Sequence, residues 1–442
     1  MGEPIAPRPA SQSTAHPGPA NPVVASSTPL PWYRAATREQ WHVLVAAQLG
    51  WALDSMDVLL YIFAITTISK EWGISPTAAG LLASITLFSS AFGGAFFGIV
   101  ADYIGRVRAL TLTVLIYAVF TGLSGLAQNV LQLGFARLLL GLGMGGEWSA
   151  GEVLVAETWP REHRGKAIGI VQGGWAVGYI LAAILAGLVL PRFGWRVLFF
   201  VGILPALLVF YIRRTVKEPE IWRTTADLRR KGKLGAEGQR FTLWQVFHRD
   251  LIKFTVIASL LASLCQMAYW GFFTWIPTFL SSAAEKGGAG LSIVKTSLWI
   301  VPMQIGALAG YITFGMISDW LGRRPAFVIY LVSMGILVPI FGHTRNETAL
   351  LLLGPVIGFF GSGYFSGFGA LLAELFPTRA RGSAQGFIYN FGRGVSAFSP
   401  ALIGFIATSQ GFGFAIGTVS FFTIAAALTV LLFPETKAKA LD

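Results

Sequence analysis

Five charged side chains lie inside long apolar stretches of this sequence, where a charge is costly. An ionised carboxylate or guanidinium at the centre of a hydrocarbon layer costs about 3 kcal/mol or more, so such a residue is by default a functional candidate. Glu147 is the weaker fifth candidate. The other four are Asp54, Asp57, Arg137 and Arg393. Their chemistry points to proton exchange at the carboxylates and to anion binding at a guanidinium.

Asp54, Asp57 and Tyr61 are spaced at i, i+3 and i+7, which places them on one stripe of a helix. Two carboxylates this close in a low dielectric cannot both be ionised cheaply, so the pair should titrate as a coupled unit. Such a pair is what a proton carrier needs.

Arg137 is the expected partner of these carboxylates. It lies about 6 residues, or ~9 Å, from one end of its stretch, while Asp54 lies about 11 residues, or ~17 Å, from the start of its own. These depths allow pairing, so we interpret Arg137 as a switchable partner that competes with the proton. The alternative is a permanent buried ion pair that only holds two helices together.

Arg393 lies near mid-depth of its stretch, about 10 residues or ~15 Å from its start. Gly392 and Gly394 flank it, and no acidic residue is evident at that depth in the last six stretches. We therefore expect its guanidinium fork to hold an anionic ligand. The alternative is pairing with Asp54, Asp57 or Glu147, which a ligand could displace.

Other polar and aromatic residues within the stretches could line a shared cavity, although any one of them could equally serve as an interhelical hydrogen bond. Gln172 and Tyr389 occupy equivalent places in the two repeats described below. The expected lining consists of Asn390, Tyr389, Gln172, Trp175, Tyr61, Gln266, Tyr269, Trp270 and Tyr364.

The composition predicts the elements that must position these residues. Of 442 residues, 54% are hydrophobic and 12% are charged, against roughly a quarter charged in an ordinary soluble domain. Twelve apolar stretches are each long enough to cross ~30 Å of hydrocarbon as a helix, which predicts an all-α membrane protein. They are 43–66, 78–101, 109–127, 130–155, 167–190, 195–212, 252–280, 297–317, 325–341, 349–373, 383–406 and 412–433.

Charge and cysteine usage exclude several other classes. The single cysteine and five scattered histidines give no metal site, and we expect no cofactor and no enzymatic activity. The net charge of +12 follows the positive-inside pattern, which predicts two cytoplasmic termini rather than a nucleic-acid partner. The basic segment 213–249 predicts contact with anionic lipid. Six basic residues are expected outside: Lys70, Arg192, Arg196, Lys286, Lys295 and Arg345.

The chain repeats itself at an offset of 217 residues. Two loop motifs share this register, which indicates duplication into parallel six-helix halves with a site between them. The predicted organisation is a disordered cytoplasmic tail (1–40), an N-terminal bundle (41–213), a connector (214–250), a C-terminal bundle (251–434) and a short tail (435–442). The motifs are Gly98-x-x-x-Asp102-x-x-Gly105-Arg106 with Gly315-x-x-x-Asp319-x-x-Gly322-Arg323, and Glu157-x-x-Pro160-x-x-x-Arg164-Gly165 with Glu374-x-x-Pro377-x-x-x-Arg381-Gly382.

These loops predict a conformational latch at the cytoplasmic helix ends. Asp102 or Asp319 could cap a helix N-terminus and hold a neighbouring helix. The alternative is a set of tight turns with positive-inside arginines. The latch residues are Asp102, Arg106, Asp319, Arg323, Glu157, Arg164, Glu374 and Arg381.

The doubled loops resemble those of the major facilitator superfamily over about 41–437, although the first loop reads Arg106-Val107-Arg108 where the second has the more typical Arg323-Arg324-Pro325. The resemblance also rests on Arg137-x-x-x-Gly141-x-Gly143 and Pro434-Glu435-Thr436-Lys437.

Within that superfamily, Asp54-x-x-Asp57, Gly145-Gly146-Glu147-Trp148 and Gly392-Arg393 are similar to the sialate and monocarboxylate:proton symporters and to the aromatic-acid:proton symporters. The resemblance implies proton coupling through Asp54 and Asp57 and recognition of an organic anion by Arg393. The segment 169–190 lacks the Gly-Pro signature usual in drug antiporters.

We therefore expect a monomeric symporter of the bacterial inner membrane that takes up a small organic carboxylate with a proton by alternating access. One alternative is a proton-coupled symporter of a neutral solute such as a sugar. The other is a membrane receptor on the same fold that binds a ligand without transporting it.

Overall fold

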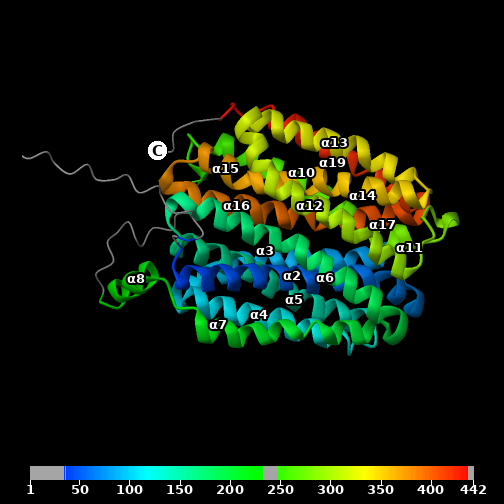
Figure 1. Cartoon of the computed structure of the whole chain (residues 1–442), viewed down its shortest axis with the longest axis horizontal. Coiled ribbons are helices and arrows are strands. Elements are labelled where there is room, and N and C mark those ends of the chain that lie inside the picture. Colours follow the sequence, from blue (N-terminus) through cyan, green and yellow to red (C-terminus); the bar gives the residue numbers. More distant parts are fainter. Residues whose placement is uncertain (1–33, 35, 232–245, 437–442) are drawn as a thin grey trace, which may run out of the picture. The chain divides into compact units, whose positions relative to one another are not determined.

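The computed structural model describes residue 34 and the ranges 36–231 and 246–436. The predicted tails and connector therefore lie partly outside the described residues. Within the described ranges the chain forms α-helices and short 3-10 turns, and no strand. Two sets of helices lie side by side, with the blue-to-green N-terminal set below the yellow-to-red C-terminal set in Figure 1.

The N-terminal half is built from five long helical segments and ends in a short helix, α8 (Glu220–Arg230), that begins the connector. The segments are α2 (Arg38–Trp72), α3 (Pro76–Ile104), α4 (Arg106–Ser124), α5 (Val130–Thr158) and α6 (Arg161–Val201), which continues through η1 (Leu204–Leu207) into α7 (Leu208–Thr215).

The C-terminal half has six crossings, and most of them are divided into two consecutive helices. They are α10 (Ile252–Phe273) with α11 (Ile276–Ser281), α12 (Ile293–Leu321), α13 (Arg323–His343), α14 (Glu347–Ser362) with η4 (Gly363–Ser366) and α15 (Gly367–Leu375), α16 (Thr378–Ser396) with α17 (Phe398–Gln410), and α18 (Phe412–Gly417) with α19 (Ser420–Val430); η3 (Ala284–Lys286) lies in the loop after α11.

The predicted all-α membrane fold is confirmed. Nine helical runs of the described residues are long and apolar enough to cross a membrane, and one of them, Lys166–Thr215, has 50 residues. Gly194, with a φ of 76°, breaks this run into two crossings. The nine runs therefore contain ten crossings. The helix α5, which carries Arg137, and the pair α16 with α17, which carries Arg393, supply the remaining two of the twelve expected crossings.

The two halves start and stop their helices at equivalent residues, each pair again 217 apart. At two helix N-termini in each half, the cap side chain accepts a hydrogen bond from the backbone N–H three residues further along the chain. This bond satisfies one free donor of the first turn. At two turns the chain needs a positive φ, which glycine adopts without strain. The pairs are Ser75 with Ser292, Asn129 with Asn346, Gly105 with Gly322 and Gly194 with Gly411.

The halves contact each other through α3 with α16 and α17, through α12 with α6, and through α2 with α11. We call the end that holds Gly105 and Gly322 the motif end, and the opposite end, which holds Gly194, the far end. At the far end hydroxyl groups meet across the interface, at 3.3 Å between Thr66 and Ser281 and at 3.2 Å between Thr77 and Thr408.

At mid-depth the halves are joined by tyrosine hydroxyl groups. The Trp175 Nε1–H donates to the Tyr269 hydroxyl over 2.6 Å, and the Tyr179 hydroxyl donates to the Phe273 carbonyl over 3.0 Å.

Candidate functional site

A cavity lies at mid-depth between the two halves, with Arg393 in its wall. Seven of its ten lining residues are aromatic. Its volume is about 30 Å³, enough for two or so water molecules at about 10–15 Å³ each. A larger ligand therefore has to push these side chains apart. The lining consists of Trp51, Gln172, Trp175, Gln266, Tyr269, Trp270, Tyr311, Phe365, Tyr389 and Arg393.

The aromatic rings of this cavity contact one another in sequence. The Trp175 ring centroid lies 4.8 Å from that of Trp51 and 5.7 Å from that of Trp270, where the ring planes cross at 86°. Tyr269 continues the series, 5.7 Å from Trp270 and 5.4 Å from Phe365. The rings come from both halves, so the cavity wall is shared between them.

Arg393 is 2% exposed and lies against two of these rings. Its Cζ is 5.3 Å from the Tyr389 ring centroid and 6.0 Å from that of Trp51, within the range of a cation–π contact. The flanking glycines let neighbouring helices approach, because a Cβ at Gly392 would lie 2.9 Å from Gln266 Nε2 and one at Gly394 would touch Ala91.

Asp54 and Glu147 both interact electrostatically with Arg393 and with each other. They are 0% and 1% exposed. Neither oxygen of Asp54 has a hydrogen-bond partner in the described part of the chain, and the same holds for Oε2 of Glu147. Two buried carboxylates therefore face one guanidinium, an arrangement with one more negative than positive group when all three are ionised.

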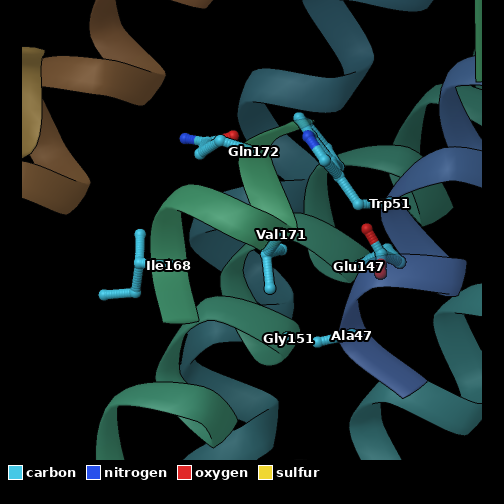
Figure 2. A pocket seen from close by; sticks show the side chains of 7 residues that line it. All are labelled: Ala47, Trp51, Glu147, Gly151, Ile168, Val171 and Gln172. Atoms are coloured by element: carbon cyan, nitrogen blue, oxygen red, sulfur yellow. The ribbon is translucent and has the colours of Figure 1, made fainter. Parts of the chain in front are cut away.

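A second, smaller cavity adjoins the first on the motif-end side and is drawn in Figure 2, where the Glu147 carboxylate lies between Trp51 and Ala47. It shares Trp51 and Gln172 with the first cavity, and its volume of about 10 Å³ suits a single water molecule. The lining consists of Ala47, Trp51, Glu147, Gly151, Ile168, Val171 and Gln172.

Asp57 belongs to a different group of side chains. The Thr121 hydroxyl donates to its Oδ2 over 3.1 Å, and it interacts electrostatically with Arg137. Arg137 donates to the Thr86 hydroxyl over 3.2 Å and to the Val58 carbonyl over 3.4 Å. No ion pair within the described residues joins Arg137 to a carboxylate.

The predicted stripe of Asp54, Asp57 and Tyr61 therefore divides between two environments. Positions i and i+3 differ by about 60° around a helix. Asp54 interacts electrostatically with Arg393, whereas Asp57 accepts a hydrogen bond from Thr121. Tyr61 follows Asp57, because its ring lies 4.7 Å from the Arg137 Cζ. Asp54 and Asp57 still interact electrostatically, as expected of a pair, although each also has neighbours of its own.

Six of the nine residues expected to line a cavity lie in its wall: Gln172, Trp175, Gln266, Tyr269, Trp270 and Tyr389. Tyr61 instead lies with Arg137. Tyr364 lies elsewhere, because its hydroxyl donates to the Cys265 carbonyl over 3.3 Å in the buried C-terminal core. Asn390 is also outside the wall, and its Nδ2 donates to the Gly386 carbonyl over 3.0 Å. The expectation for these three residues is corrected accordingly.

Three lining residues were not anticipated from the sequence: Trp51, Tyr311 and Phe365. Trp51 had a usable signal, because it lies three residues before Asp54 and therefore on the same helical stripe. Tyr311 and Phe365 had none, because aromatic residues are common throughout the crossings.

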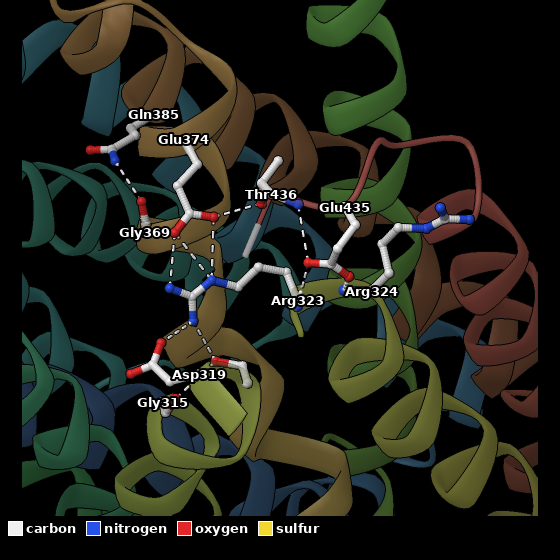
Figure 3. A network of polar contacts seen from close by, with 10 residues as sticks. Gly315, Asp319, Arg323, Arg324, Gly369, Glu374, Gln385, Glu435 and Thr436 are labelled. Carbon is white, nitrogen blue, oxygen red and sulfur yellow. Dashed lines mark hydrogen bonds and ion pairs between the residues drawn. The ribbon is translucent and has the colours of Figure 1, made fainter. Parts of the chain in front are cut away.

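At the motif end of the C-terminal half, Arg323 is the centre of a polar network (Figure 3). Its guanidinium contacts Glu374 at 2.9 Å and Asp319 at 2.7 Å. Glu435 accepts hydrogen bonds from the backbone N–H groups of Arg323 and Arg324 at 2.8 and 3.1 Å. The Thr436 hydroxyl donates to Glu374 over 2.6 Å.

The N-terminal half repeats this arrangement. Arg106 pairs with Glu157 at 2.9 Å, and Glu218 accepts from the backbone N–H groups of Val107 and Arg108 at 3.2 and 3.3 Å. The side chains of Asp102, Arg164 and Arg381 lie outside the described part of the structure.

The C-terminal network corrects the expectation for Asp319, while that for Asp102 lies outside the described side chains. Glu435 caps the N-terminus of α13, and Asp319 instead pairs with Arg323 one turn along the chain. The close approach depends on the loop glycine, since a Cβ at Gly322 would lie 2.9 Å from Glu435 Oε2. Glu218 has the same relation to Gly105.

Comparisons with known proteins agree with this architecture. The sequence profile of the Major Facilitator Superfamily matches residues 47–303 and 288–441. The chain is 35% identical to a probable 4-methylmuconolactone transporter of Cupriavidus pinatubonensis, over 93% of this chain and 94% of that protein. It is 30% identical to a sialic acid transporter of Escherichia coli, over 91% and 94% of the two chains.

Among solved structures, a D-xylose-proton symporter superimposes with a TM-score of 0.71 at 20% identity, covering 91% of this chain and 100% of that one. The fold and the sequence comparisons define a multi-pass membrane transport protein, not an enzyme. The chain belongs to the major facilitator superfamily.

Proposed function

We propose that this transporter is a symporter that takes up a small organic carboxylate together with a proton. The observation that carries the proposal is the buried Arg393 guanidinium in the wall of a central cavity, facing the buried carboxylates of Asp54 and Glu147. The names of relatives that transport organic acids, such as sialic acid, support the same class of substrate.

The charges of the cavity suggest how the two fluxes are coupled. When no ligand is bound and the two carboxylates carry one proton between them, Asp54, Glu147 and Arg393 together have no net charge. A bound monoanion adds one negative charge, which a second proton neutralises. Because uncompensated charge is costly in a closed, dry cavity, the halves close over the anion only when the extra proton is present. One proton then moves with each monoanion.

Alternating access completes the cycle. With the motif end in the cytoplasm, the halves are closed at the outer end by the hydroxyl contacts of Thr66 with Ser281 and Thr77 with Thr408. Separation of these outer contacts opens the site to the opposite side of the membrane.

We also propose the topology expected from the charges: insertion in the bacterial inner membrane as a monomer, with both termini cytoplasmic and the basic connector against anionic lipid. Residues 232–245 of that connector lie outside the described structure. Reporter fusions at the N-terminus, the connector and the C-terminus test the topology. A periplasmic signal from any of the three would contradict it.

Uptake into proteoliposomes tests the proposed function. A thermal-shift screen of organic acids on the purified protein supplies a radiolabelled substrate, and uptake is then measured with and without an imposed inward proton gradient. We expect accumulation only with the gradient, and its loss in the double variant Asp54→Asn with Glu147→Gln. Accumulation that does not depend on the gradient, or that is retained in the double variant, would contradict the proposal.

The role of Arg393 is tested separately, by binding. Arg393→Ala should abolish the thermal shift caused by carboxylates. Retained affinity for the anion would show that the guanidinium does not bind it, and competition by a neutral sugar instead of by carboxylates would favour a neutral substrate.

A further inference from the structure

Asp54 lies apart from both cavities described above. Its carboxylate is buried, neither oxygen has a hydrogen-bond partner among the described residues, and it belongs to the wall of neither cavity. Glu147 differs, because it lies in the wall of the small cavity on the motif-end side, which has room for about one water molecule (Figure 2). A proton on Asp54 can therefore reach the motif end by way of Glu147.

Tyr117, on α4, lies beside both of these carboxylates. Its hydroxyl is 3.5 Å from the Gly50 carbonyl, on the turn of α2 that leads to Asp54. Glu147 reaches the same turn from α5, because a Cβ added at Gly50 would collide with its Oε1. Tyr117 accordingly interacts electrostatically with Glu147 and Asp54. It also interacts with Asp57, so one phenol lies near three buried carboxylates.

Helix packing holds Tyr117 in this place. The helix α5 approaches α4 closely at Gly143, where an added Cβ would lie 2.8 Å from the Tyr117 backbone nitrogen. Glu147 follows Gly143 by one helical turn, so the same face of α5 brings it beside Tyr117. On α4, Thr121 follows Tyr117 by one turn and donates to Asp57. This face of α4 is therefore turned toward the carboxylates of α2.

The Tyr117 hydroxyl is suited to exchanging partners. A hydrogen bond between a hydroxyl and an oxygen is usually about 2.5–3.0 Å long, so the contact of 3.5 Å with Gly50 is weak. The Gly50 carbonyl lies within α2 and can accept from its own helix. Turning the hydroxyl away therefore costs little. A phenol can donate its proton to an ionised carboxylate while its oxygen accepts one from a protonated carboxyl.

We propose that Tyr117 relays the proton between Asp54 and Glu147. The O–H bond of protonated Asp54 breaks and its proton passes to the Tyr117 oxygen, while the original Tyr117 proton passes to the ionised carboxylate of Glu147. Tyr117 is a neutral phenol before and after, so the step needs no other reactant. The proton then leaves Glu147 through the small cavity, without passing through the central one. The inference rests on the proposed function, since it names the residue that moves the proton of the same cycle.

The substitution Tyr117→Phe tests the relay, because it removes the hydroxyl and keeps the ring. Infrared difference spectra of the substrate-free, full-length protein in detergent are recorded after a rapid change from alkaline to acidic pH. The C=O stretch of each protonated carboxyl is followed in time, and Asp54→Asn and Glu147→Gln assign the two bands. In Tyr117→Phe we expect the Asp54 band to rise at least about tenfold more slowly than in wild type, because the positioned proton carrier is lost. The Glu147 band should rise at an unchanged rate.

Tyr330→Phe is the matched control. Tyr330 is also buried, and it lies on α13, the helix that corresponds to α4 in the repeat. The side chain that hydrogen-bonds to its hydroxyl is Thr313, which is not a carboxylate. This variant should leave the rates of both bands unchanged. Should Tyr117→Phe fail to fold, Tyr117→Met provides the same test, because Met334 is the buried residue at the equivalent position of the C-terminal half.

The outcomes distinguish this inference from the function on which it rests. An Asp54 band that rises equally fast in wild type and Tyr117→Phe would overturn the relay, and so would an equal slowing of both bands, which indicates a general change of structure. Absence of either band from the wild-type spectra would overturn the assignment of the proton to these carboxylates. The measurement uses no substrate, so a wild-type protein that fails to accumulate carboxylates would overturn the proposed function and leave the measured relay standing.

Discussion

Neutralising Asp54 should strengthen anion binding, not weaken it. In the structure this carboxylate is buried, has no hydrogen-bond partner of its own among the described residues, and interacts with Arg393. When ionised, it competes with a ligand carboxylate for the same guanidinium. Asp54→Asn removes that competition while keeping the size of the side chain.

The size of the effect follows from Coulomb's law. Two unit charges in a protein interior attract by about 2 kcal/mol at ~8 Å with an effective dielectric constant of ~20. Removing this attraction from the empty state corresponds to a gain of roughly 30-fold in anion affinity. The gain should be present at alkaline pH, where Asp54 is ionised, and should vanish at acidic pH, where the wild-type carboxylate is already protonated.

Calorimetric titration with the substrate over a pH series measures this change. Wild-type affinity should rise as the pH falls, by at most about tenfold per pH unit for one linked proton. Asp54→Asn should flatten this slope, and the further substitution Glu147→Gln should remove what remains. The double variant should still exchange labelled for unlabelled substrate, and it should lose accumulation driven by the proton gradient.

The matched control is Asp57→Asn. Asp57 lies one turn along the same helix, but it accepts a hydrogen bond from Thr121 and interacts with Arg137. Its neutralisation should leave anion affinity within about threefold of wild type. Weaker binding in Asp54→Asn, or an unchanged pH slope in the double variant, would refute the assignment of Asp54 and Glu147 to the proton.

Three further substitutions test other parts of the structure. Gly151→Leu should fill the small cavity beside Glu147 and reduce gradient-driven uptake at least tenfold without loss of binding. Gly151→Ala should be tolerated because its Cβ would lie 3.6 Å from Glu147 Oε1. Equal uptake by the two variants would contradict a role for this cavity. Glu435→Gln should weaken a helix cap by about 1 kcal/mol and lower the melting temperature measured by fluorescence; an unchanged value would argue against the cap. Arg323→Lys should lose the bidentate contact with Glu374 and slow uptake several-fold with unchanged substrate affinity. A change in substrate affinity without a change in uptake rate would contradict a conformational role for Arg323.

The fold could be predicted from the sequence because its signals are redundant. Apolar length specifies the crossings, and the common offset of the loop motifs specifies the duplication, so the error in any one signal matters little. The repeat even extends to caps that the sequence comparison had not used, such as Ser75 and Ser292. The buried charges were equally predictable, because each stands out against hydrocarbon.

Side-chain direction was not predictable in the same way. Asp54 and Asp57 share a helical stripe, and their separation into two charge groups depends on the neighbours that α5, α16 and α4 bring to each. The caps by Glu218 and Glu435 were missed although their common offset was visible. Their contacts join residues more than a hundred positions apart, which local spacing does not reveal.

These two caps have a consequence for the order of synthesis. In each half, the glutamate that completes the loop between the second and third crossings comes from just after that half, at 218 and at 435. This loop therefore stays incomplete until the ribosome has made that entire half. A chain cut short before residue 435 would lack the second glutamate, and the backbone N–H groups of Arg323 and Arg324 would lose this partner.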